Sequence, residues 1–451
     1  MRPSDSLRLC AALALVCLLI ALAIGFAAGA RPAGPRASDQ TAPVGPDWYA
    51  ALPLDADRAT DAFLARVPDT MRQRGEAVAD SRYWALAARL LANVGVLFLL
   101  VSSGAAGRLD ALAARISSRS FARTAILAAV MLTFQFIVTL PVDVIAGYWR
   151  WRHFGFSDRP FLDWLVDHSL EWTSLAGFTA VGLIAVAAVI RRAPRSWPWW
   201  AGGVYLVLAL AHGIATPLAI EPMLNRYTPL PDSPLKQQVL ALAHAAGVPT
   251  DDVYVLDASR QSRVLNAHVS GIGPVARISL DDSTLEHAFA PAVLAVVAHE
   301  IGHYREHDML KAILFDSALS MVGLLIVARI AGALMASRGE RWALARFGSA
   351  PSIVLLWALF SAWGFASAPV LDAFLRHQEA RADSYSLEQA RAPEGLAEFM
   401  IHDADTARLR PSMLDVVLFH DHPGSASRVA AAMQWRAQHP QQQGFSSGGT
   451  R

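Results

Sequence analysis

Seven long apolar stretches limit the folding of this chain more than any other feature of its sequence. A helix needs about 20 predominantly apolar residues to cross the hydrocarbon core of a bilayer. The stretches cover residues 9–29, 83–106, 124–148, 175–190, 199–220, 309–335 and 352–374. The composition agrees with them, because 54% of the residues are hydrophobic and only 17% are charged. The sequence therefore predicts a mainly α-helical, polytopic membrane protein with about seven transmembrane helices.

The first apolar stretch has two interpretations. Arg2 and Arg8 precede it, and the small residues 28–30 resemble a cleavage site, so residues 1–30 are either a transmembrane anchor or a secretory signal. The length of the stretch favours an anchor that is retained. Cys10 and Cys17, the two cysteines of the chain, both lie in it, so no disulfide framework is predicted for the rest.

The apolar stretches divide the remaining chain into parts. We expect an extramembrane loop with short helices at 31–82, a transmembrane domain at 83–220, a polar module at 221–308, two transmembrane helices at 309–374, a second polar part at 375–439 and a disordered tail at 440–451. In the polar module, the short apolar runs 252–256 and 275–280 are typical of strands. A strand at the edge of such a sheet would align an extended peptide through main-chain hydrogen bonds.

The distribution of arginine indicates the orientation in the membrane. The short connections 107–123, 191–198 and 337–347 are rich in arginine, and they alternate along the chain so that all three lie on one side, with Arg2 and Arg8. The positive-inside rule then predicts a cytoplasmic amino terminus and polar modules that face outward. Lys236 and Lys311 are the only lysines of the chain, and this preference for arginine suggests a bacterial protein, so we expect a bacterial inner membrane. The net charge of +1 argues against a nucleic-acid partner.

The segment His299-Glu300-Ile301-Gly302-His303 is the strongest indication of function. On a helix, residues four apart lie one turn apart on the same face, so His299 and His303 can bind one metal ion with Glu300 beside it. Catalytic zinc takes three protein ligands and keeps one position for water, so a third ligand is required. Glu379 is the best candidate, and Asp383, one turn further on, can hydrogen-bond a ligand histidine.

This motif predicts a zinc metalloendopeptidase that binds one Zn²⁺ ion. Glu300 would be the general base, taking a proton from the activated water and returning it to the leaving amine. Two other classes stay open. A membrane scaffold with a structural zinc site would have four protein ligands and no open position. A transporter would show paired broken helices and internal symmetry, which the sequence does not show.

Several motifs together resemble those of the integral-membrane gluzincin peptidases, and in particular the type 1 CAAX prenyl proteases, the a-factor-converting enzymes. They are Leu265-Asn266-Ala267, the run 277–285 before the zinc motif, Glu379 with Asp383, and His422-Pro423 with Arg428. Residues 83–90 and 153–157 resemble the amino-terminal membrane domain of that family. The resemblance covers most of residues 80 to 435, and the order and spacing of the motifs make it specific.

The resemblance implies a cage of seven membrane helices around a large water-filled chamber, with a zinc-peptidase module at one end. It implies that His299, His303 and Glu379 are metal ligands, that Glu300 is the general base, and that Asp383 orients a ligand histidine or donates a proton. Asn266 would hold the substrate backbone. His422 and Arg428 would lie at the rim of the site and stabilise the oxyanion or the substrate.

The substrate that the resemblance implies is a peptide or protein, processed as in CAAX-box maturation, with or without a lipid. The alternative is a quality-control peptidase of the membrane that acts on substrates without a prenyl group.

Overall fold

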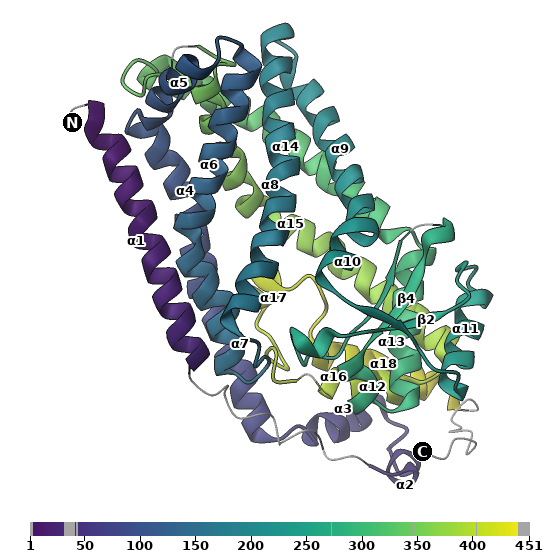
Figure 1. The fold of residues 1–451 in the computed structure, drawn as a ribbon. Coiled ribbons are helices and arrows are strands. Elements are labelled where there is room, and N and C mark those ends of the chain that lie inside the picture. Colours follow the sequence, from purple (N-terminus) through teal and green to yellow (C-terminus); the bar gives the residue numbers. More distant parts are fainter. Residues whose placement is uncertain are drawn as a thin grey trace.

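The computed structural model describes residues 3–30, 41, 44–271, 273–344, 346–402 and 404–440. The long helices form a bundle, and the polar segments gather into a module at one end of it (Figure 1). The tail for which the sequence predicts disorder lies outside the described residues from position 441 onward.

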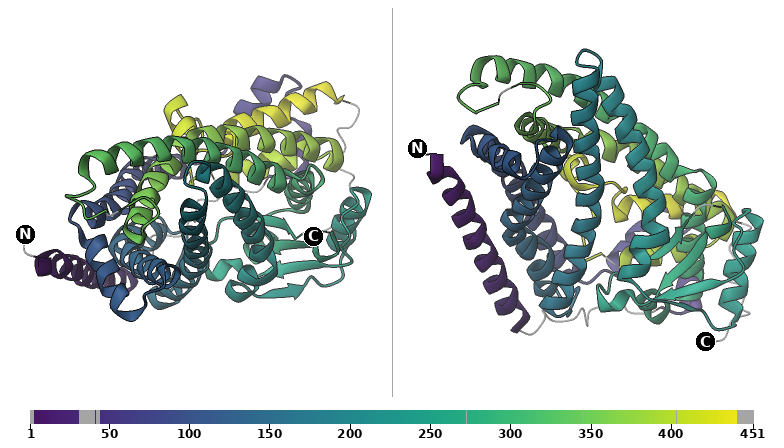
Figure 2. Two further views of the ribbon diagram at one scale, coloured as in Figure 1. Left: turned by 90° about the horizontal axis from the view of Figure 1, so that it is seen from above. Right: turned by 45° about the horizontal axis from the view of Figure 1, so that its top comes forward.

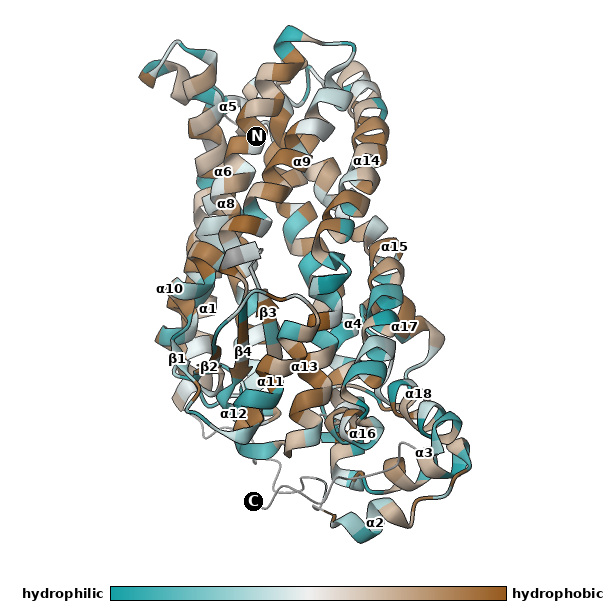
Figure 3. Ribbon diagram, turned by 90° about the vertical axis from the view of Figure 1, so that its right-hand side faces the viewer, coloured by the Kyte–Doolittle hydropathy of each residue, from teal (hydrophilic) through white to brown (hydrophobic). Residues whose placement is uncertain are grey.

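Seven helices among the described residues are long and apolar enough to cross a membrane, which confirms the predicted class. They are α1 (Pro3–Ala30), α4 (Asp69–Ser102), α6 (Ser120–Asp143), α8 (Phe161–Arg192), α9 (Trp197–Ala215), α14 (Asp308–Arg338) and α15 (Ala350–Ala390). Two of them continue through a π-helical turn into a short helix: α6 through Val144–Trp149 into α7 (Arg150–His153), and α9 through Thr216–Ile220 into α10 (Glu221–Leu224). Apolar residues predominate along the bundle, whereas the module carries more hydrophilic residues (Figure 3).

Two of these helices run well beyond their apolar stretches, at the module end. Helix α4 begins at Asp69 rather than near residue 83, and α15 continues to Ala390 rather than ending near residue 374. The polar extension of α15 packs against α13 (Ala290–Arg305) in the module. Because packing replaces apolar length as the reason for helix formation there, hydropathy alone placed these ends wrongly.

The arginine-bearing connections meet at the opposite end of the bundle. The first includes the short helix α5 (Ala105–Ile116), which follows Gly104 with its positive φ of 71°. The ring of Trp197 lies 5.7 Å from that of Phe347, and Arg191 donates to the carbonyl of Gly348 (3.3 Å). The amino terminus lies at this same end (Figure 1). The alternation of the predicted spans is therefore confirmed.

The module contains a small four-stranded sheet of order β1-β2-β4-β3. Strands β2 (Val253–Leu256) and β4 (Arg277–Asp281) are parallel and correspond to the two runs that the sequence indicates. Strands β1 (Tyr227–Pro229) and β3 (Ala267–Ser270) were not predicted; each pairs antiparallel with one inner strand. Because β3 has a neighbour on one side only, it forms an edge of the sheet beside α13.

Helix α13 lies at the centre of the module, between the sheet, α15 and the C-terminal helices. It is rich in alanine and valine and begins with Pro291 in its first turn, which suits a helix buried on most sides. The other elements of the module are the 3₁₀ turns Ala258–Arg260 and Gly273–Val275 and the helices α11 (Pro234–Ala245), α12 (Asp282–His287), α16 (Pro393–His402), α17 (Met413–Phe419) and α18 (Ser425–Gln438).

The segment before α4 belongs to the module rather than forming a separate loop. Its helices α2 (Pro46–Ala50) and α3 (Ala56–Ala65) contribute Phe63 and other residues to the core that also holds Ile278 and Ile301. The buried Arg436 of α18 donates to the carbonyl of Pro53 (2.9 Å), and Arg66 pairs with Glu398. These contacts fix residues 46–67 against α16 and α18.

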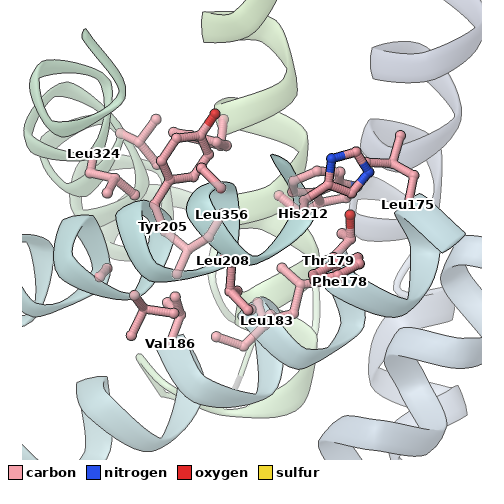
Figure 4. A pocket seen from close by; sticks show the side chains of 18 of the residues that line it. Leu175, Phe178, Thr179, Leu183, Val186, Tyr205, Leu208, His212, Leu324 and Leu356 are labelled. Carbon is pink, nitrogen blue, oxygen red and sulfur yellow. The ribbon is translucent and has the colours of Figure 1, made fainter. Parts of the chain in front are cut away.

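Helices α8, α9, α14 and α15 line a partly open cavity of about 550 Å³ in the bundle. Most of its walls are apolar, as the side chains of Leu175, Phe178 and Leu208 show (Figure 4). Tyr205 and His212 are among its few polar residues (Figure 4). The hydroxyl of Tyr205 donates to Asp316 (2.5 Å), so this intramembrane carboxylate pairs with a phenol.

Candidate metal centre

The close approach of α13 and α15 builds the site. Gly302 faces α15 so closely that a Cβ atom there would lie 3.1 Å from the ring of Tyr385 and 3.4 Å from the Cα of Ala382. One turn after Ala382 on α15, the hydroxyl of Ser386 donates to the carbonyl of Ala295 on α13 (2.6 Å). The small residues of α13 therefore let α15 approach, and this brings a side chain nearly 80 positions away in sequence to the two histidines.

His299, His303 and Glu379 form a group in which the potential ligand atoms all lie within 4.8 Å of one another. The two Nε2 atoms of the histidines are 3.1 Å apart, and they lie 3.2 and 3.3 Å from the carboxylate oxygens of Glu379. Ligands at tetrahedral zinc distances of about 2.0–2.1 Å are about 3.3 Å apart. Oε2 of Glu379 is buried, and its close polar neighbours are the imidazoles of His299 and His422. The donor set and its spacing fit one zinc ion.

Each histidine is held from behind by a carboxylate. Nδ1 of His299 lies 2.9 Å from Oδ1 of Asp383, and Nδ1 of His303 lies 3.0 Å from Oδ2 of Asp308. Gln378 donates to Asp308 in turn (3.2 Å). A carboxylate at Nδ1 fixes the ring orientation and leaves Nε2 to face the metal.

Arg428 lies behind His299 rather than at the rim of the site. Its guanidinium donates to both carboxylate oxygens of Asp383, at 2.8 and 2.5 Å, and its Nη2 lies 3.4 Å from Nδ1 of His299. Only 11% of its side chain is exposed. This arrangement favours an orienting role for Asp383, since a carboxylate paired with a buried arginine is poorly suited to give up a proton.

His422 lies on the open side of the site. Its Nε2 is 3.2 Å from Oε2 of Glu379, its Nδ1 is 2.8 Å from Asp421, and half of its side chain is exposed. Asn266 precedes β3, where its side-chain oxygen accepts from the N–H of Ala267 (2.9 Å). Glu300 follows His299 on α13 and is partly exposed. The structure thus gathers the ligand candidates and His422, and it places Asn266 at the neighbouring edge strand.

The electrostatics of the two histidines favour positive charge at the site. Burial disfavours the imidazolium of His299, but hydrogen bonds with Asp383 and Glu379 outweigh this and raise its pKa to about 9. The pKa of His303 is raised as well, because Glu379 outweighs the effect of burial. A metal ion must displace protons from such ligands, so its affinity falls as the pH falls.

Sequence reasoning missed Asp308, Gln378 and Asp421. Asp308 carried the clearest available indication, because a carboxylate five residues after a ligand histidine is a natural partner for its second nitrogen. Gln378 and Asp421 act through Asp308 and His422, and only the folded chain shows those contacts.

Comparisons with known families match two parts of the chain. Residues 229–436 match the model of peptidase family M48, and residues 67–226 match the CAAX prenyl protease N-terminal model, described as five membrane helices. The first match contains every residue of the metal centre, and the second covers α4, α6, α8 and α9.

Individual relatives agree with these families. The chain is 28% identical to the uncharacterized metalloprotease YhfN of Bacillus subtilis over 66% of its length and 70% of that protein. It is 27% identical to CAAX prenyl protease 1 of Saccharomyces cerevisiae, but this alignment spans only 40% of each protein. The fold matches the crystal structure of Ste24p from S. mikatae with a TM-score of 0.66 and 17% identity, covering 93% of this chain and 98% of the other.

Proposed function

Since this chain is an integral-membrane metallopeptidase that resembles the type 1 CAAX prenyl proteases, we propose that it cleaves internal peptide bonds with one zinc ion held by His299, His303 and Glu379. The observation that carries the proposal is the triangle of ligand atoms with zinc spacing, with Glu300 next to the first ligand. Three ligands from the protein leave a position for water, whereas a structural zinc site would be closed by a fourth. This favours an enzyme over a scaffold.

In the proposed mechanism, each residue of the site has a separate role in peptide hydrolysis. A zinc ion held there supplies a water activated for attack and a Lewis acid that polarises the substrate carbonyl. Glu300 accepts a proton from the attacking water and delivers it to the leaving amine. Asp383 and Asp308 hold the two imidazoles, and Arg428 fixes Asp383. No covalent bond forms between the chain and the substrate.

His422 has a role on the open side of the site. Its ring lies beside Glu379, half exposed, and Asp421 holds its Nδ1. From this position it donates a hydrogen bond to the oxyanion that develops on the substrate carbonyl.

Strand β3 binds the substrate backbone. The N–H of Asp281 donates to the carbonyl of Asn266 (3.2 Å), so in the alternating antiparallel ladder the main-chain groups of His268 also face β4. Those of Ala267 and Val269 then point to the free edge. An extended peptide can pair with that edge, and Asn266 supports it at the start of the strand.

The substrate is a membrane-associated peptide or protein, processed as in CAAX-box maturation. The apolar cavity between α8 and α9 supports a substrate that carries an apolar group. The alternative is quality control on membrane substrates that carry no prenyl group. We place the protein in a bacterial inner membrane, with the metal centre on the outer side.

The test is cleavage by the purified protein in detergent. The wild-type protein should contain about one zinc ion per chain and cleave members of a peptide library, with activity lost on chelation and restored by zinc. Glu300→Gln should keep the zinc and lose at least 10²-fold in kcat/KM, because the proton acceptor is removed while the ligands remain. Unchanged cleavage by Glu300→Gln would refute the mechanism.

A further inference from the structure

Three polar side chains project from one face of the sheet beside the edge strand. His268 of β3 pairs with Ser279 of β4 in the antiparallel ladder, and Asp281 follows two residues later on the same face. The alternate residues on these strands, Ile278 and Leu280, are fully buried in the core on the opposite face. No metal ligand belongs to this group of three, which we call the His268 face.

The His268 face contains two buried polar atoms that lack a close hydrogen-bond partner within the described chain. Ser279 is only 1% exposed and Asp281 only 4%. Neither Oγ of Ser279 nor Oδ1 of Asp281 has a hydrogen bond. Asp281 stands at the N-cap of α12, yet its carboxylate makes no capping bond. Leaving buried polar groups unpaired is costly, so an incoming group that forms hydrogen bonds with these two atoms would gain binding energy.

The half-exposed side chain of His268 lies beside the carboxylate of Asp281, with its Nε2 3.5 Å from Oδ1. At 3.5 Å this contact is too long for a strong hydrogen bond. Since 43% of the His268 side chain is exposed, the ring has room to turn away from the carboxylate.

The His268 face also lies close to the metal centre and in a negative field. Burial lowers the pKa of His268, but the contact with Asp281 outweighs this and raises the pKa, with smaller contributions from the charges of Asp281, Glu300 and Glu221. Glu221 is already paired with Arg277 (3.2 Å). The general-base candidate Glu300 is thus near enough to act on His268, and Asp281 remains the carboxylate without a strong partner.

We propose that the His268 face is a subsite that binds a basic side chain, lysine or arginine, of the peptide substrate. The proposal rests on the proposed peptidase function and adds a preference to it. A peptide strand paired with the edge of β3 projects every second side chain to this face of the sheet. A carboxylate accepts hydrogen bonds only, and an ammonium or guanidinium group supplies the donors that Asp281 and Ser279 lack.

The test compares matched peptides in which lysine or norleucine occupies each position around the cleaved bond in turn. At one position the wild-type protein should prefer lysine by about tenfold in kcat/KM, as expected for one charge-assisted contact. Asp281→Asn should abolish that preference and leave cleavage of the norleucine peptide within about twofold. His268→Ala should raise the preference, because the carboxylate loses its competing partner. Asp232→Asn, at an exposed position of the same module, should change neither rate.

Binding separates this proposal from the peptidase activity. Affinities for the same peptides are measured with the Glu300→Gln protein, alone and combined with Asp281→Asn or His268→Ala, so that turnover is not needed. Lysine selectivity that falls in Asp281→Asn and rises in His268→Ala supports the subsite. If Asp281→Asn fails to fold, a rise in His268→Ala supports it, and unchanged selectivity in His268→Ala overturns it. Equal selectivity in all versions overturns the subsite even if every peptide is cleaved. Absence of cleavage by the wild-type protein refutes the proposed function alone.

Discussion

Carboxylates from two different helices hold the two histidines that we propose as metal ligands, and this is the main feature of the site at the scale of residues. Asp383 comes from α15 and Asp308 from the start of α14, and both are buried. A buried carboxylate that holds an imidazole decides which ring nitrogen faces the metal, so its loss affects metal affinity more than folding.

Replacing Asp308 with asparagine should lower the zinc affinity 10- to 100-fold, because the amide holds His303 more weakly and in a less defined tautomer. Competition with a chromophoric chelator measures this. Glu306→Gln is the matched control, since Glu306 lies in the same turn but pairs with Lys311 and Arg381 at the surface. Equal affinities for Asp308→Asn and the wild-type protein would contradict the role of Asp308.

His402, at the end of α16, should make the module sensitive to acid. Burial, with a smaller effect of His287, lowers its pKa from 6.5 to about 4. The folded protein therefore keeps His402 neutral while the unfolded chain takes up a proton below pH 6.5. Its contribution to stability is complete above pH 6.5 and is lost as the pH falls toward 4, by up to about 3 kcal/mol.

The measurement is the midpoint of thermal unfolding in detergent between pH 7 and 4. His402→Gln should unfold with a weaker dependence on pH than the wild-type protein, since the titrating group is gone. His439→Gln, at the end of α18, serves as the control. If the wild-type protein and His402→Gln lose stability in parallel, the assignment to His402 is wrong.

At the scale of elements, helices of the module approach one another through glycine. Gly302 brings α13 to α15, and Gly395 brings α16 to the first turn of α13. Gly395 faces main-chain atoms of Pro291 and Ala292, which cannot move aside as a flexible side chain can, whereas Gly302 faces the side chain of Tyr385 and the Cα of Ala382. The position of α13, and with it the spacing of the zinc ligands, depends on these contacts.

Gly395→Ala should destabilise the module by about 1–3 kcal/mol, because a Cβ atom there would overlap the carbonyl oxygen of Pro291. The midpoint of thermal unfolding should fall, and zinc should be released at a lower temperature. Gly364→Ala is a suitable control, since a Cβ atom on that glycine of α15 meets nothing within 4 Å. A midpoint for Gly395→Ala equal to that of the control would show that α16 can shift without cost.

At the scale of the whole molecule, the two ends of the helix bundle carry different parts of the chain. The arginine-bearing connections and the amino terminus lie at one end, and the module with the metal centre lies at the other (Figure 1). Seen from above in Figure 2, α1 lies at the outer side of the bundle, away from the sheet. The structure distinguishes the arginine-rich end from the module end, but not which side of the membrane each faces. The positive-inside rule assigns the arginine-rich end to the cytoplasm.

Fusing a reporter enzyme that is active only after export tests the orientation. A fusion after Glu340, in the third arginine-bearing connection, should be inactive, and a fusion after Pro440 should be active. A cytoplasmic reporter should give the reverse pattern. Activity of the exported reporter at Glu340 would invert the orientation and place the metal centre in the cytoplasm.

The sequence by itself determined the local features of this protein. Apolar length predicted seven membrane helices, since bilayer thickness sets a requirement that each segment meets alone. The four-residue spacing placed His299 and His303 on one helix face, because helix geometry is local. The need for a third zinc ligand singled out Glu379, which the structure brings within 3.3 Å of His303.

Only the tertiary structure decided which distant segments meet. It placed Arg428 behind His299, Asp308 against His303, and residues 46–67 inside the core of the module. It also formed the short strands β1 and β3, whose sequences Tyr-Thr-Pro and Ala-His-Val-Ser contain no apolar run and which exist through pairing with their neighbours. These features follow from packing between elements that are far apart in the chain. Such packing depends on the folded arrangement, so no local sequence pattern predicts it.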